Sequence, residues 1–256
     1  MGGRGSNSGL NPKPTNAATS VSLDDGTEID LSDFPLTYGE KDAYVDGDRR
    51  KAIEEFEDKR YKAKIEYGQV IDKDGNVLYN NKGSKGRCHL DYFALQSEGG
   101  VATHNHPRSG KDAGALGGTF SIADLTIVAN RKISTIRATA AEGTYSITKQ
   151  AGFKASEFLS YANGVEKRLR AAYNAELKTL GEKLNADYKN AKSPTESKSL
   201  WEKYHQDSTK AFNKYLVNSH NSLLAGQKEY GYSYSLERRE KKEQPKSTRK
   251  EKKKNG

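Results

Sequence analysis

Residues 101–130, VATHNHPRSGKDAGALGGTFSIADLTIVAN, decide the fold class of the central part of this chain. Val101–His104 predicts a short strand, and a glycine-rich loop follows it. Ser121 precedes the apolar run Ile122–Asn130 and is typical of a helix N-cap, so we expect a helix there. A strand, a loop and a helix in this order are a unit of an α/β or α+β domain.

Short alternating elements extend this unit over residues 64–152. Ile65–Ile71 is predicted to be a strand, Asp74-Gly75 is a hairpin turn signal, and Val77–Tyr79 begins a return strand. The other expected elements are a helix around His89–Gln96 and two strands, Ile133–Thr139 and Thr144–Lys149. The pattern predicts a small α/β (α+β) domain.

The regions on both sides of residues 64–152 differ from it in composition. Residues 1–21 are rich in Gly, Ser, Asn and Pro and are predicted to be disordered. Residues 22–63 are predicted to form an extended arm and a lead-in helix from Asp48 to Ala63. Residues 153–230 carry apolar stripes at helical spacing with a break at Ser193-Pro194, which predicts a helical hairpin. Residues 231–256 are predicted to be a disordered basic tail.

The formal net charge of +9 is concentrated in that tail. From Glu237 to the end there are ten Lys/Arg against four glutamates, so the body before it is nearly neutral. The tail could bind nucleic acid or an acidic partner electrostatically, or serve only to keep the chain in solution. The single cysteine, Cys88, and the lack of a long apolar run predict a soluble protein in the cytoplasm, with no membrane partner.

His104 and His106 are the residues with the clearest chemical meaning. Side chains two apart on a strand point to the same face, so both imidazoles can bind one ion. Asp124 would approach from the helix that Ser121 opens. Two imidazoles, a carboxylate and one open position are what a catalytic zinc site needs. Ser121 and Asp124 also fit a capping box, a purely structural interpretation of the same spacing.

The combination of His104-Asn105-His106-Pro107 with Ser121-Ile122-Ala123-Asp124 resembles the motif of the JAMM (MPN-plus) metalloprotease family. In that family a glutamate precedes His-x-His-Pro and Ser-x-x-Asp. The asparagine between the histidines also occurs in the RadC-like branch and in JAB-type domains of phages and mobile elements. The resemblance implies a mixed sheet flanked by helices over residues 64–152, and Zn2+ bound by His104, His106 and Asp124.

The resemblance also implies the catalytic residues. The family's glutamate lies on the first strand of the domain, which indicates Glu66, although Glu98 and Glu54 or Glu55 are also upstream. Ser121 would lie beside the zinc-bound water and stabilise the oxyanion. The implied activity is hydrolysis of a peptide or isopeptide bond in a protein or peptide substrate, with Glu66 as general base and then acid.

A second hypothesis is a non-catalytic phage or nucleic-acid-associated structural protein that uses the JAMM fold as a scaffold. The start of the chain, MGGRGSNSG, is similar to the start of many phage head-associated proteins and makes a phage origin plausible. A phage-encoded protein would be expected in the host cytoplasm or associated with the virion. Among the remaining residues, Cys88 is interpreted as a small buried side chain, and His205 and His220 as surface or packing histidines. Gly114–Gly118 is predicted to be a flexible flap beside the site.

Overall fold

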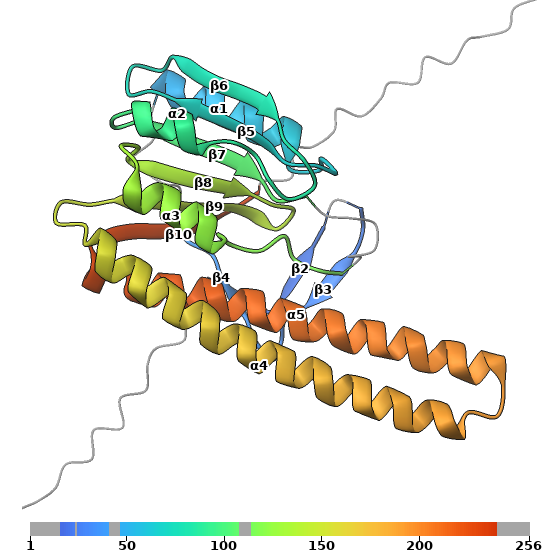
Figure 1. The fold of residues 1–256 in the computed structure, drawn as a ribbon. Coiled ribbons are helices and arrows are strands. Elements are labelled where there is room, and N and C mark those ends of the chain that lie inside the picture. Colours follow the sequence, from blue (N-terminus) through green and yellow to red (C-terminus); the bar gives the residue numbers. More distant parts are fainter. Residues whose placement is uncertain (1–15, 24, 41–46, 108–113, 240–256) are drawn as a thin grey trace, which may run out of the picture.

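The computed structural model describes residues 16–23, 25–40, 47–107 and 114–239 (Figure 1). These residues form a mixed α/β structure with a six-stranded sheet and two long helices, which confirms the predicted fold class. Among the helices of the described residues, none is long and apolar enough to cross a membrane.

The six-stranded sheet is antiparallel except at its centre. Its strands, in spatial order, are β10 (Tyr232–Arg238), β9 (Gly143–Lys149), β8 (Thr135–Thr139), β7 (Val101–Asn105), β5 (Tyr67–Ile71) and β6 (Val77–Lys82). Only β7 and β8 run parallel, and the helix α3 (Ile122–Asn130) connects them. Parallel neighbours need such a crossover. The predicted strands and α3 are therefore confirmed to within a few residues.

Three helices cover the two faces of this sheet. The helix α1 (Gly47–Arg60) contacts β5 and β7 on one face, while α2 (Asp91–Gln96) and α3 lie on the other (Figure 1). All five residues of β7 are buried, because the strand lies inside the sheet with a helix on either side. This central position encloses the strand that carries His104.

The N-terminal arm is extended, as predicted, and packs onto the body. Its strands form two small antiparallel pairs, β1 (Ala17–Ala18) with β4 (Leu36–Thr37), and β2 (Ser20–Ser22) with β3 (Glu28–Asp30). The arm buries seven apolar side chains in the main core: Val21, Leu23, Ile29, Leu31, Phe34, Leu36 and Tyr38. The predicted disorder up to residue 21 is wrong from Ala17 onward, because β1 and the start of β2 lie there; residues 1–15 lie outside the described part.

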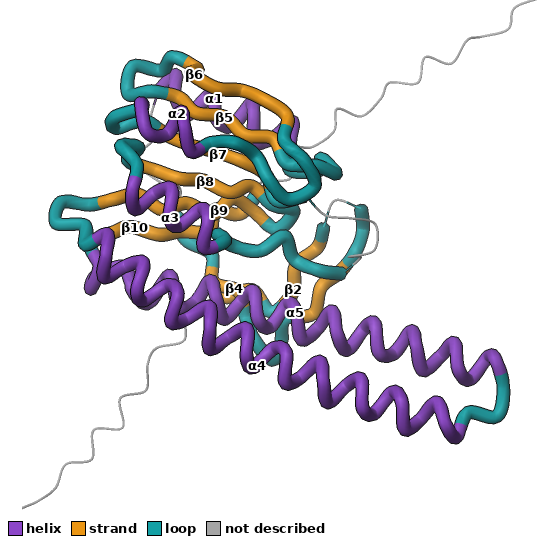
Figure 2. The backbone as a smooth tube through the Cα atoms, viewed as in Figure 1, coloured by secondary structure: helices purple, strands orange, loops and turns teal. Residues whose placement is uncertain are grey.

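The predicted helical hairpin is present as α4 (Ala155–Asn190) and α5 (Pro194–Tyr230), seen side by side in Figure 2. Ser193 caps α5 by accepting a hydrogen bond from the Glu196 backbone amide, and Pro194 opens the helix. Each helix is about 54 Å long at 1.5 Å per residue. In α4 the buried residues end at Val165, so the outer part of the hairpin extends away from the sheet.

The strand β10 corrects the prediction of a disordered tail over residues 231–256. Gly231, with φ of 72°, ends α5 in the left-handed conformation that favours glycine. Tyr232, Tyr234 and Leu236 are then buried at alternate positions, and all seven residues of β10 pair with β9. The hairpin is therefore inserted between two neighbouring strands of one sheet. The tail residues 240–256, which are predicted to bind an acidic partner or nucleic acid, lie outside the described part.

A buried ionic cluster joins β10 to the rest of the fold. The Arg137 guanidinium on β8 is 1% exposed and donates to Glu57 of α1 at 2.8 Å and to Glu237 of β10 at 3.0 Å. The Thr103 hydroxyl of β7 donates to the same Glu57 carboxylate at 2.9 Å. Because these groups are buried away from water, the guanidinium and the carboxylates stabilise one another's charges.

Candidate metal centre

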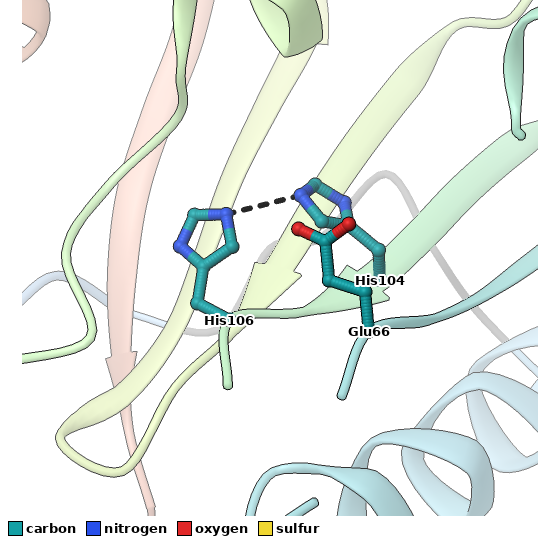
Figure 3. A group of neighbouring side chains, drawn as sticks. All are labelled: Glu66, His104 and His106. Carbon is teal, nitrogen blue, oxygen red and sulfur yellow. Dashed lines mark hydrogen bonds between the residues drawn. The ribbon is translucent and has the colours of Figure 1, made fainter. Parts of the chain in front are cut away.

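His104 and His106 converge as the two-residue spacing predicted. His104 is the fourth residue of β7, and the backbone amide of His106 continues the strand pairing by donating to Thr139 at 2.9 Å. The Nε2 atoms of the two rings lie 3.1 Å apart (Figure 3). Two nitrogens bound to one tetrahedral zinc at 2.0–2.1 Å would be about 3.3 Å apart. The spacing of the two nitrogens is therefore close to the one that a shared ion would require.

The hydrogen bonds of His106 fix which of its nitrogens is free. Nδ1 lies 2.9 Å from the carbonyl oxygen of Gly118, and a carbonyl can only accept. The proton of a neutral His106 ring is therefore on Nδ1, and Nε2 has a lone pair facing His104. Burial and the neighbouring His104 both lower the pKa of His106, which keeps the ring in this metal-binding form.

Asp124 lies close to both histidines from the first turn of α3. Its Oδ1 lies 3.3 Å from His104 Nε2, and its Oδ2 lies 3.9 Å from His106 Nε2. Burial raises the pKa of Asp124, but the two histidines and the Ser121 hydroxyl outweigh this and hold it well below its usual range. Burial lowers the pKa of His104, yet Asp124 and Glu66 raise it overall. The lone pair of His106 Nε2 and the Asp124 carboxylate thus both face His104 Nε2. This arrangement favours a cation among the three groups.

Ser121 has the capping role that its spacing to Asp124 predicted. It is the N-cap of α3 in a complete capping box, with its amide donating to Asp124 Oδ2 at 2.8 Å. Its hydroxyl donates to the same oxygen at 2.7 Å. The cap therefore orients the Asp124 carboxylate toward the histidines. Because the hydroxyl has only one proton, the expected oxyanion role requires it to rotate away from Asp124.

Glu66 is the upstream glutamate that the fold brings to the histidines. It lies one residue before β5, and its carboxylate oxygen and a ring nitrogen of each histidine are all within 4.8 Å of one another (Figure 3). Burial and Asp124 raise the pKa of Glu66, with His104 and the Cys88 amide opposing them. No other glutamate joins this cluster among the residues that the structure describes. Glu98 is in the turn before β7, and Glu54 on α1 pairs with Arg50.

Asn105 is a site residue whose role the sequence analysis missed. Its side chain accepts a hydrogen bond from the Tyr67 amide at 2.7 Å and donates to the Ile65 carbonyl at 3.1 Å. Backbone pairing between β5 and β7 ends at Gly68 and His104, so the amide side chain takes the place of the next backbone pair. It holds the chain on both sides of Glu66. The only sequence signal was the asparagine between the two histidines.

Glu142 is a second residue that the sequence did not reveal. Its carboxylate accepts hydrogen bonds from the amides of Gly117 and Gly118, at 3.0 and 2.8 Å, and from the Tyr145 hydroxyl at 2.9 Å. The Gly118 carbonyl in turn accepts from His106. Such a contact to the far side of a ligating ring fixes its orientation. Residues 114–118 are therefore held by hydrogen bonds, which corrects the expectation of a flexible flap; residues 108–113 lie outside the described part.

The remaining candidates fit their structural interpretations. Cys88 is half-buried, and burial together with Glu66 raises the pKa of its thiol, which makes a reactive thiolate unfavourable. His220 is buried and lies 2.7 Å from the Tyr234 hydroxyl. His205 is exposed and lies edge-on to Trp201 near the end of the hairpin.

No protein-family model, curated protein or solved structure matches this chain. Two imidazole nitrogens and a carboxylate oxygen fit the ligand set of a catalytic zinc site, which has three protein ligands and one open position.

Proposed function

We propose that the chain is a zinc-dependent metallopeptidase or isopeptidase of the JAMM type. The observation that carries the proposal is the convergence of His104, His106 and Asp124, with the Glu66 carboxylate beside the two imidazoles. In this proposal the two histidines and the aspartate bind Zn2+, and a protein or peptide is the substrate.

A zinc ion held by His104, His106 and Asp124 would have one position left for water. A bound zinc ion is a Lewis acid that makes the water bound to it acidic near neutral pH. His106 presents its Nε2 lone pair because the Gly118 carbonyl fixes the proton on Nδ1. Asp124 stays ionised through the histidines and Ser121. These contacts set the ligands' protonation states before any metal binds.

Glu66 is suited to move the proton. Its carboxylate is half-buried, and its raised pKa makes it a better proton acceptor than an exposed glutamate. In the proposed reaction Glu66 takes a proton from the attacking water and delivers it to the leaving nitrogen of the amide. This donation is needed because an unprotonated amine anion is a poor leaving group.

Ser121 would serve the transition state after its hydroxyl rotates from Asp124 toward the substrate carbonyl. Its side chain is at the exposed start of α3, next to the ligand Asp124, so it is open to a substrate. A single oxyanion donor contributes about 2.7–4 kcal/mol in other enzymes. The Ser121 amide would continue to hold Asp124 during this step.

The proposal is tested by separating metal binding from turnover. The full chain is loaded with Zn2+ and incubated with a mixture of unmodified peptides and ubiquitin-like conjugates, and cleavage is followed by mass spectrometry. We expect Glu66→Gln to keep zinc and lose cleavage by about 100-fold or more. His104→Ala should lose zinc, and a chelator should stop the wild-type reaction. The control Glu98→Gln, at an exposed glutamate outside the cluster, should leave both unchanged.

Two results would contradict the proposal. Near-wild-type cleavage by Glu66→Gln would show that another group moves the proton. A wild-type chain that binds zinc but cleaves none of these substrates would favour the scaffold hypothesis instead.

A further inference from the structure

A cavity of about 420 Å³ begins at the candidate metal centre and leads away from it. His106 and Ser121 line it at one end, and α3 forms one side. The opposite side consists of the inner ends of α4 and α5, which belong to the inserted hairpin. Ligand-binding cavities are typically about 300–1,000 Å³, so this one can hold part of a substrate.

The wall of this cavity is mostly apolar. Leu125 of α3, Val165 of α4, and Phe212, Leu216 and Leu223 of α5 are among its lining residues. An apolar side chain that entered would leave water for a surface of similar character, which is the main source of favourable free energy in such sites.

The charged groups of the cavity are already paired with one another. Glu166 accepts hydrogen bonds from the Tyr215 hydroxyl at 2.6 Å and from the Arg170 guanidinium at 2.7 Å. The same guanidinium donates to the Tyr215 oxygen at 2.9 Å. A charged ligand side chain would lose its hydration here without meeting an uncompensated opposite charge, and this is unfavourable.

The hairpin also contacts the loop that orients His106. A Cβ atom built on Gly118 would lie 2.6 Å from Leu216 Cδ2, so α5 packs directly against the backbone whose carbonyl binds His106. Asn213 of α5 adds two hydrogen bonds to this loop, accepting from the Leu116 amide at 2.9 Å and donating to the Gly114 carbonyl at 2.8 Å. The cavity and the metal centre therefore share one wall.

We propose that this cavity binds a large apolar side chain, of the size of leucine or phenylalanine, next to the bond that the enzyme cleaves. The proposal rests on the function proposed above. It assigns the choice of substrate to the hairpin, because Val165, Phe212 and Leu216 come from α4 and α5. The substrate class is then an extended peptide with an apolar residue beside the scissile bond.

The test measures binding without metal or turnover. The chelator-treated full chain is titrated with peptides acetyl-Ala-Ala-Xaa-Ala-Ala-amide, where Xaa is Leu, Phe, Ala, Asp or Lys, while the methyl resonances of Val165 and Leu223 are followed by NMR. We expect the Leu and Phe peptides to shift these resonances and to bind about tenfold or more tightly than the other three. Equal affinities, or unmoved resonances, would overturn the proposal.

Blocking variants locate the binding. Ser219→Phe and Ser222→Phe each place a ring in the cavity from α5 and should abolish the preference for Leu and Phe. Ser199→Phe is the matched control, because it makes the same change at an exposed position of the same helix. Two blocking positions are used so that misfolding of one variant, visible in its methyl spectrum, leaves the other. Retained preference in a folded blocking variant would contradict the proposal.

The two proposals can fail separately. Binding of the Leu peptide in the cavity by a chain that never hydrolyses a peptide would leave the cavity assignment intact and refute the enzyme. Chelator-sensitive cleavage at the same rate for the Leu and Ala peptides, with the Val165 and Leu223 methyl resonances unmoved, would refute the cavity assignment and leave the proposed enzyme intact.

Discussion

Replacing Asn105 by leucine tests whether this side chain positions Glu66. The substitution keeps a similar shape but removes both hydrogen bonds, to the Tyr67 amide and the Ile65 carbonyl. Asn105 is buried, so these two backbone groups would lose their partners away from water. Each buried unpaired group costs about 1–3 kcal/mol, so we expect a loss of about 3 kcal/mol in the free energy of unfolding.

The effect on catalysis should be separable from that on stability. Displacement of a reacting group by about 1 Å can reduce a rate about 100-fold, and Asn105 holds the chain on both sides of Glu66. We therefore expect Asn105→Leu to bind zinc with unchanged stoichiometry but to cleave about 100-fold more slowly under conditions where it remains folded. Asn80→Leu, at an exposed residue of β6, is the control and should alter neither quantity.

Chemical denaturation, zinc analysis and a cleavage assay on the two variants give the answer. Asn105→Leu with wild-type turnover would refute the claim that this side chain positions Glu66. Loss of zinc in the same proportion as turnover would show that Asn105 supports the ligands instead.

Two further predictions concern stability. Arg137→Met removes the buried cation that pairs with both Glu57 and Glu237, although Arg50 still lies 3.6 Å from Glu237. It should lower the free energy of unfolding by about 3 kcal/mol. Arg131→Met, at an exposed pair, should change it by less than about 1 kcal/mol in the same denaturation experiment, and equal effects would contradict this reasoning. Burial lowers the pKa of His220 to about 4, whereas a histidine in the unfolded chain has a pKa of about 6.5. Between pH 6.5 and 4 the unfolded chain therefore binds a proton that the folded protein does not. The free energy of unfolding should fall by about 3 kcal/mol more over this range in the wild type than in His220→Gln. Parallel pH profiles for the two chains would show that His220 does not titrate in this way.

Local signals made parts of the fold predictable. Ser121 caps the helix whose start it indicated, because the preference of a serine for an N-cap depends on a few neighbouring backbone groups. The predicted break at Ser193-Pro194 is also where α5 begins. The strand β10 was missed because the charged residues after it dominated the composition. Its sequence, Tyr-Ser-Tyr-Ser-Leu, alternates large apolar and small polar residues as a half-buried strand does.

Side-chain periodicity alone predicted the candidate site only where its residues are close in sequence, whereas Asp124 and Glu66 were expected from the resemblance. The period of a strand predicted that His104 and His106 would converge. The choice of Glu66 over the other glutamates depends on the register of β5 against β7, which places Gly68 opposite His104. The roles of Asn105 and Glu142 depend on backbone groups far away in the chain, and no sequence period indicates such contacts.

The most direct test of the central claim is zinc K-edge X-ray absorption on the full chain loaded with one equivalent of Zn2+. We predict two imidazole nitrogens and one carboxylate oxygen, with one further oxygen from water, at about 2.0–2.2 Å from the metal. The imidazole contribution should be lost in His104→Ala. A spectrum of hydrated zinc, or one that is unchanged in His104→Ala, would contradict the assignment of His104, His106 and Asp124 as zinc ligands.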